Sequence, residues 1–330
     1  ATLALQLKNN YGLSKFYCDA NDIGEAGCEK LAQCMEMMDS LKKVCLENNN
    51  IGDKGAIAVA KALEDNDTLL SLHLENNNIS RTGAYTLGEM ISNKYKLSKL
   101  NLNHNPLGDE GFSRIAKGMQ DIETLRIITL AGTQLGPDSM PLLSKALVNK
   151  RFLTKLVLDN NNIGQKGAQV LAEGIRSNET LTNLHLANCQ LGEEGTFEVA
   201  SILGNKKNLL VLDLTNNKTG VSGCLAVCKA IQQHTTLREL FLSNNMIGPD
   251  GAKAVAKVLE NTKYITELWM NSNGIFPDGA AALGKALQDK KCLETLCLKR
   301  NDIGTIGCNE LINVLQNSKT VRVLDMSGNN

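Results

Sequence analysis

The sequence predicts an α/β solenoid in which one strand–turn–helix unit repeats along the chain. Two observations carry this prediction. The pattern L-x-x-L-x-L-x-x-N-x-I-G-x-x-G returns every 28 residues, with no insertion or deletion over the eleven periods between positions 21 and 329. Within each period the apolar spacing changes from two residues to three or four, which is typical of a strand followed by a helix.

The strand comes first in each unit, and residues 41–68 illustrate it. Val44 and Leu46 alternate with Cys45, so the two aliphatic side chains share the buried face and Cys45 is predicted to be exposed on the other. Cys297 has the same place in a later unit and receives the same prediction.

The turn after the strand contains the most regular residue of the repeat. An asparagine amide has two donors and an acceptor, enough to bond the free backbone groups of the bend and to link neighbouring units. Its loss costs about 1–3 kcal/mol for each buried group left unpaired. The predicted ladder comprises Asn21, Asn49, Asn77, Asn105, Thr133, Asn161, Cys189, Asn217, Asn245, Asn273, Asn301 and Asn329, with Thr and Cys as small substitutes.

The helix follows the first glycine of the pattern, and in three units a proline stands at its start, where its missing N–H costs nothing. The proline positions are Pro137, Pro249 and Pro277. Successive strands must be parallel at about 4.8 Å spacing, whereas helices are about 10 Å wide. The stack should therefore curve into an open horseshoe, with strands on the concave face and helices on the convex face.

Composition excludes several functional classes. The chain has 330 residues, more than one compact core usually supports, but a repeat array escapes that limit because each unit packs only on its neighbours. Lys and Arg total 35 and so do Asp and Glu, so the net charge of zero favours neither nucleic acid nor an anionic membrane as partner. No apolar run approaches the roughly 18 residues of a membrane-spanning helix.

The ten cysteines occupy repeat positions that otherwise hold small or apolar residues. Cys28, Cys224 and Cys308, for example, each follow the second glycine, where alanine stands in other units. We therefore predict buried free thiols, a reducing compartment and a cytoplasmic location.

The segment LVLDNNNIGQKGAQVLAEGIRSN, residues 156–178, resembles the ribonuclease-inhibitor-like subclass of leucine-rich repeat proteins. The resemblance covers the whole chain and implies a single solenoid domain, residues 1–330, with eleven full repeats and partial repeats at both ends. It implies a protein-binding module that is not an enzyme and has no cofactor. The strict 28-residue period is most similar to the sensor repeats of cytosolic NOD-like receptors and to intracellular or ciliary repeat proteins.

Both ends of the chain fall inside a unit. Residues 1–12 match the second half of a helix, and the last residue follows ladder Asn329 directly. Neither end has the polar capping repeat that solenoids use to shield their terminal core. These features predict a segment of a longer protein, with uncapped ends prone to end-to-end or edge association.

The predicted binding surface lies on the concave face, at the fifth position of L-x-x-L-x-L. The only tryptophan of the chain, Trp269, has this position one unit after Phe241. Large aromatic residues are enriched in binding hot spots, although an exposed apolar pair can also be merely tolerated. The predicted partner-binding residues are Phe241, Trp269, Arg238, Asp213, Lys299 and Arg300.

No catalytic or metal site is predicted. His73, His104 and His185 are spread over too many units to share one ion. Residues 279–285 fit the start of a phosphate-binding loop, but the repeat predicts a helix there.

The leading hypothesis is therefore non-catalytic recognition of a protein through the concave face. Two alternatives stay open. One is a structural segment of a large assembly such as a ciliary complex. The other is a small-GTPase-activating role similar to that of the Ran regulator, although the sequence has no distinctive loop arginine for it.

Overall fold

The computed structural model describes residues 12–288, 292–316, 318 and 320–329. The predicted helical half-unit at the N-terminus thus lies outside the described residues, apart from residue 12. The rest confirms the α/β repeat fold, in which short parallel strands alternate with helices in chain order.

The strands of the described chain are all three residues long, and their order in the sheet is their order in the sequence. They are β1 (Lys15–Tyr17), β2 (Lys43–Cys45), β3 (Ser71–His73), β4 (Lys99–Asn101), β5 (Ile127–Thr129), β6 (Lys155–Val157), β7 (Asn183–His185), β8 (Val211–Asp213), β9 (Glu239–Phe241), β10 (Glu267–Trp269), β11 (Thr295–Cys297) and β12 (Val323–Asp325).

The helices follow the turns as the repeat predicts. They are α2 (Gly24–Met35), α3 (Gly52–Ala62), α4 (Arg81–Ile91), α5 (Gly108–Met119), α6 (Met140–Leu147), α7 (Gly164–Ile175), α8 (Gly192–Leu203), α9 (Gly220–Ile231), α10 (Gly248–Asn261), α11 (Phe276–Leu287) and α12 (Gly304–Leu315), with a 3₁₀ helix, η1 (Pro137–Ser139), before α6. The segment 279–285 is therefore helical, so its backbone N–H groups cannot form a phosphate-binding loop.

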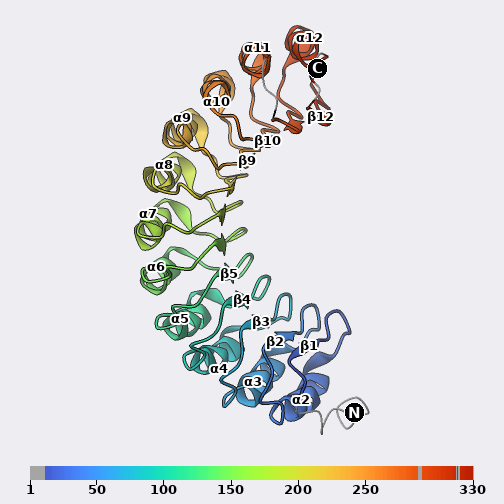
Figure 1. Ribbon diagram of the computed structural model, residues 1–330, viewed down its shortest axis with the longest axis vertical. Coiled ribbons are helices and arrows are strands. Elements are labelled where there is room, and N and C mark those ends of the chain that lie inside the picture. Colours follow the sequence, from blue (N-terminus) through green and yellow to red (C-terminus); the bar gives the residue numbers. More distant parts are fainter. Residues whose placement is uncertain (1–11, 289–291, 317, 319, 330) are drawn as a thin grey trace. The chain divides into compact units, whose positions relative to one another are not determined.

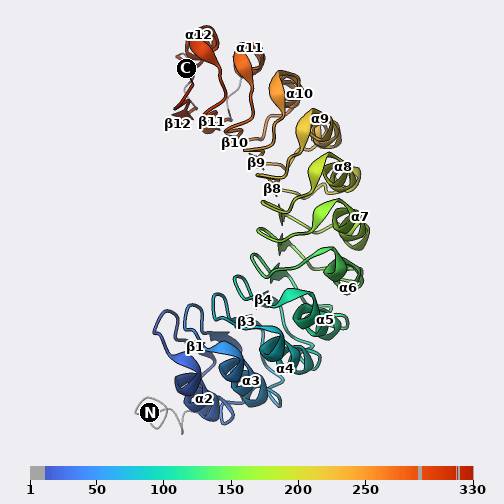
Figure 2. The same ribbon diagram turned by 180° about the vertical axis from the view of Figure 1, so that it is seen from behind.

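The described chain forms two compact units. Unit 1 comprises the residues up to Asn162 together with Glu173–Asn178, and unit 2 comprises Ile163–Ala172 and Glu179–Asn330. Strands β1 to β6 belong to unit 1 and β7 to β12 to unit 2. Within each unit the helices all lie on one side of the strands (Figures 1 and 2). We call the other side of the strands the open face of that unit.

The register of the strands shows no slip. In unit 1 Leu72 pairs with Leu100, and in unit 2 Leu240 pairs with Leu268, in each case 28 residues apart. These central strand residues are fully buried under the helices. The residues before and after each of them consequently point to the open face.

The repeat that contains β5 departs from the pattern. Gly136 is extended, at φ −107°, and leads into the 3₁₀ helix η1 and then α6, the shortest of the described α-helices. The repeat that contains β10 differs at Phe276. This residue replaces a glycine whose backbone is left-handed in most other repeats. Phe276 keeps that left-handed conformation, at φ +57°, a strained choice for a bulky residue.

A second buried polar column, which the sequence reasoning missed, lies one turn beyond the helices. Lys94 Nζ donates to Glu64 O at 2.6 Å and Lys150 Nζ to Gln120 O at 2.9 Å. Carbonyls at helix C-termini lack partners within the helix. Each of these lysines therefore caps the C-terminal end of the helix in the preceding repeat. Burial lowers the pKa of Lys150 to about 8.

Candidate binding surface

The ladder asparagines hold each turn to the next. Asn245 Nδ2 donates to Leu214 O at 2.8 Å and to Leu242 O at 3.0 Å, while its Oδ1 accepts from Asn217 N at 2.9 Å. Asn77 in unit 1 repeats this arrangement with Leu46 O and Asn49 N. These bonds therefore hold successive strands in the same register.

The ladder continues in altered form at its two exceptions. The Thr133 hydroxyl donates to Leu130 O at 2.6 Å, and the Cys189 thiol lies 3.5 Å from Ala187 O. Both side chains are fully buried. In each case a side chain with one donor hydrogen replaces the amide, which has two, and still bonds a backbone oxygen of the turn.

The aromatic pair lies on the open face of unit 2. Phe241 on β9 and Trp269 on β10 are register partners, and their ring centroids are 5.9 Å apart with an interplanar angle of 30°. Both side chains are half-buried, whereas their neighbours Leu240 and Leu268 are fully buried. The indole is therefore on the sheet surface and not in the hydrophobic interior.

Three acidic residues lie near this pair on the same face. Trp269 Nε1 donates to Glu267 Oε2 at 3.2 Å. Glu239 is the register partner of Glu267, and Asp213 on β8 is the register partner of Phe241. Asp213 also accepts a bond from Thr215 N at 2.9 Å. The sequence reasoning singled out Asp213 but overlooked the two glutamates, which the period-two alternation places beside the rings.

The predicted basic neighbours are placed differently. The Arg238 guanidinium lies 5.0 Å from the Tyr264 ring centroid and donates to Thr236 O at 2.7 Å. Lys299 Nζ forms an ion pair with Asp325 at 2.8 Å. That bond raises the pKa of Lys299, and together with bonds from Ser327 it lowers the pKa of Asp325 to about 2.

Arg300 is exposed on the turn after β11, in the left-handed conformation at φ +51°. None of these three basic side chains has a described contact with the aromatic rings.

The prediction that two strand cysteines are exposed was wrong. Cys45 is 4% exposed and Cys297 2% exposed, although both lie at fifth positions. A thiol is short, and larger side chains on neighbouring strands shield it: Cys45 is the register partner of Tyr17 and His73, and Cys297 of Trp269 and Asp325. Burial raises the pKa of both thiols, that of Cys45 to about 11, so neither is a reactive thiolate at neutral pH.

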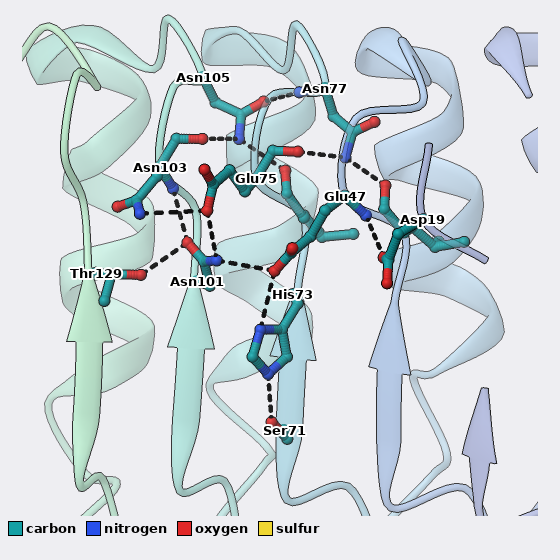
Figure 3. Close-up of polar contacts among 12 residues, drawn as sticks. Asp19, Glu47, Ser71, His73, Glu75, Asn77, Asn101, Asn103, Asn105 and Thr129 are labelled. Carbon is teal, nitrogen blue, oxygen red and sulfur yellow. Dashed lines mark hydrogen bonds and ion pairs between the residues drawn. The ribbon is translucent and has the colours of Figure 1, made fainter. Parts of the chain in front are cut away.

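The open face of unit 1 contains a bonded polar network instead of aromatic rings (Figure 3). Asn101 Nδ2 donates to Glu47 Oε1 at 3.0 Å and to Glu75 Oε2 at 2.9 Å, and Asn101 Oδ1 accepts from Thr129 Oγ1 at 2.7 Å. His73 Nδ1 lies 3.1 Å from the same Glu47 oxygen. The carboxylates of Glu47 and Glu75 are thus engaged with residues of the unit itself.

A groove on the helix side of unit 2 is the main alternative surface. It has a volume of about 830 Å³ and lies between α8 and α9, lined among others by Phe197, Lys207, Lys229 and His234. Phe197 is 61% exposed. The groove has fewer aromatic side chains than the open face, because Phe197 is the single aromatic ring in its lining apart from the imidazole of His234.

Comparison with known proteins places this geometry in a class. Six segments match the family described as Leucine Rich repeat: residues 40–60, 65–88, 96–116, 149–172, 177–200 and 233–256. These matches show that the chain contains leucine-rich repeats. The parallel strands and alternating helices show the α/β solenoid fold.

Individual relatives add little to this conclusion. No curated protein matches the chain significantly. Among the solved structures that match is Leiomodin-1 Actin-Binding Site 2 (ABS2), which is 25% identical and aligns over 43% of this chain and 86% of that chain, with a TM-score of 0.35. At such a score the likeness supports no argument about a partner.

The described helices also bear on the membrane question. None of them is both long and apolar enough to cross a bilayer.

Proposed function

We propose that the chain is a non-catalytic protein-recognition module that binds its protein partner through the open face of unit 2. The observation that carries the proposal is the half-buried pair Phe241 and Trp269, placed side by side on a sheet face that no helix of the unit covers. Repeat solenoids use such extended faces for binding, and partly buried tryptophan is a frequent hot-spot residue.

The construction of the face supports the same function. The ladder bonds fix the backbone at each turn, so the rings are presented without a loop having to become ordered. A preorganised surface loses less conformational entropy on association than a mobile one. A solenoid with a backbone fixed in this way and variable strand side chains is suited to recognition.

The cellular setting of the proposal is a reducing compartment, as in the cytoplasm. All ten cysteines are free in the structure, and seven of them are buried. Free thiols in this number are typical of proteins kept in reducing surroundings. The unbroken 28-residue period supports placing the repeats in the ribonuclease-inhibitor-like subclass.

A crosslinking experiment tests which surface binds. Phe241 is replaced by p-benzoylphenylalanine, a photoreactive derivative of phenylalanine, and Phe197 on α8 is replaced in the same way as a matched control. After irradiation in cells, we expect discrete crosslinked protein species from position 241 and none from position 197.

The converse result would assign binding to the groove between α8 and α9 and would favour the alternative of a structural segment that uses its helices as contacts. Silence at both positions would remove the proposal for unit 2 and for the groove alike.

A further inference from the structure

The two rings of the aromatic pair offer more than apolar area. Their centroid distance of 5.9 Å and interplanar angle of 30° place them nearer to offset stacking than to an edge-to-face arrangement. The faces of aromatic rings carry negative electrostatic potential and attract a cation within about 6 Å of the centroid. Because Phe241 and Trp269 are half-buried, part of each ring meets solvent.

Acidic side chains bring the same sign of potential to this spot. Glu267 bonds the edge of the indole, Glu239 is paired in register with Glu267, and Asp213 is paired in register with Phe241. Neighbouring strands are about 4.8 Å apart, so these three acidic residues occupy open-face positions on the strands of the rings or on the adjacent strand. Of the six open-face positions on β8, β9 and β10, three are acidic, two aromatic and one aliphatic; none is basic.

The nearby basic side chains are directed elsewhere. Arg238 stacks on Tyr264 and bonds the backbone oxygen of Thr236, and Lys299 pairs with Asp325. The described contacts of these two cations therefore lie away from the aromatic pair.

We infer that this surface, which we call the acidic aromatic site (Asp213, Glu239, Phe241, Glu267 and Trp269), recognises a basic segment of the protein partner. The segment places an arginine or lysine side chain on the two rings, where ring faces and carboxylates attract the same charge. The inference rests on the proposed function and specifies the chemistry of the partner.

The single tryptophan of the chain makes the site directly observable, because all indole fluorescence comes from Trp269. The full chain is titrated at 150 mM salt with an acetylated, amidated peptide of alternating glycine and arginine. Parallel titrations use peptides in which citrulline, a neutral isostere, or glutamate replaces arginine. We expect a saturable change of emission with the arginine peptide, and binding of the citrulline peptide weaker by about tenfold or more.

Two charge-neutral variants locate the effect. Glu267→Gln should weaken binding of the arginine peptide by about fivefold and leave the citrulline peptide unchanged. Glu198→Gln removes the same charge from α8 on the helix side of the unit and should leave both titrations unchanged.

Equal binding of the arginine and citrulline peptides would overturn the inference, and so would the absence of a saturable response up to about 1 mM peptide, an affinity of only about −4 kcal/mol. If position 241 still crosslinks to a protein in either case, the proposed function stands and only the basic partner is excluded. If position 241 yields no crosslink, the proposed function fails independently of the titrations.

Discussion

The open faces of the two units have the same backbone structure but different side chains, a bonded polar network in unit 1 and an aromatic pair in unit 2. Asn101 in unit 1 and Trp269 in unit 2 occupy the same position of the repeat. Asn101 joins Glu47, Glu75 and Thr129 into one network, so its polar atoms are bonded within the unit. Trp269 instead stacks on Phe241 and makes one polar bond, to Glu267.

This difference teaches how a repeat separates folding from recognition. The buried leucines and the ladder determine the backbone in both units, and the open-face positions are then free to vary. In unit 1 their side chains add bonds within the unit, and in unit 2 they form a surface that is suited to a partner. The predictions below test that division.

The largest effect is expected from the ladder, which the two units share. Asn77→Ala and Asn245→Ala each leave about three buried backbone groups unpaired. Each variant should lose at least about 3 kcal/mol of unfolding free energy, at about 1–3 kcal/mol per group. Denaturant titration, with hydrogen exchange to separate the units, measures both losses. A large loss in one unit alone would show that the ladder does not support them equally.

The next effect concerns binding and should appear in unit 2 only. The double variant Phe241→Ala/Trp269→Ala should reduce affinity for the crosslinked partner about 30-fold or more, since truncating one hot-spot residue costs about 2 kcal/mol. Its thermal midpoint should move little, because the rings lie outside the buried core. Phe197→Ala is the control. Unchanged affinity of the double variant would contradict the division between the faces.

A smaller effect is expected from the corresponding position of unit 1. Asn101→Ala removes the amide that bridges Glu47 and Glu75, so these carboxylates are left side by side. The unfolding free energy of unit 1 should fall by about 1–2 kcal/mol, while partner affinity stays the same. Calorimetry and a binding titration on the same variant distinguish these readouts. A loss of affinity here would mean that the open face of unit 1 also contacts the partner.

The smallest effect is a pH dependence in the polar network. Burial lowers the pKa of His73 below its ordinary value of 6.5, with Glu47 opposing the shift. Between these two pKa values the imidazole of His73 is protonated in the unfolded chain but not in the folded unit. The free energy of unfolding therefore falls as the pH drops from about 6.5 towards the folded pKa. His73→Gln should remove this slope from unit 1. His234→Gln serves as the control in unit 2, where burial also lowers the pKa of a histidine. An unchanged slope in unit 1 would contradict the assignment.

The fold could be predicted from the sequence because a repeat of constant length determines which residues of neighbouring strands pair. Each unit has the same length, so the pairing of Leu72 with Leu100 or Leu240 with Leu268 follows from counting alone. The position of Trp269 on the sheet surface followed from alternation within the strand. These features depend on neighbours that the pattern itself specifies.

Other features depend on long side chains whose partners the pattern does not specify. From the sequence, the Arg238 side chain could contact either the Phe241 and Trp269 rings or Tyr264. Only the packing in the structure shows that it stacks on Tyr264. Cys297 was predicted exposed because alternation describes the backbone and not how neighbouring side chains cover a short thiol. The buried lysines Lys94 and Lys150 were missed because a lysine in a polar turn reads as solvated until the helix-end carbonyls beside it are known.

The accessibility of the indole tests the central claim most directly. Acrylamide quenching of the fluorescence of Trp269 reports how far solvent reaches the open face of unit 2, and no other tryptophan contributes. We predict ready quenching in the free chain and strong protection once the crosslinked partner is bound. An indole that resists quenching in the free chain, or one that the partner leaves equally accessible, would contradict the account.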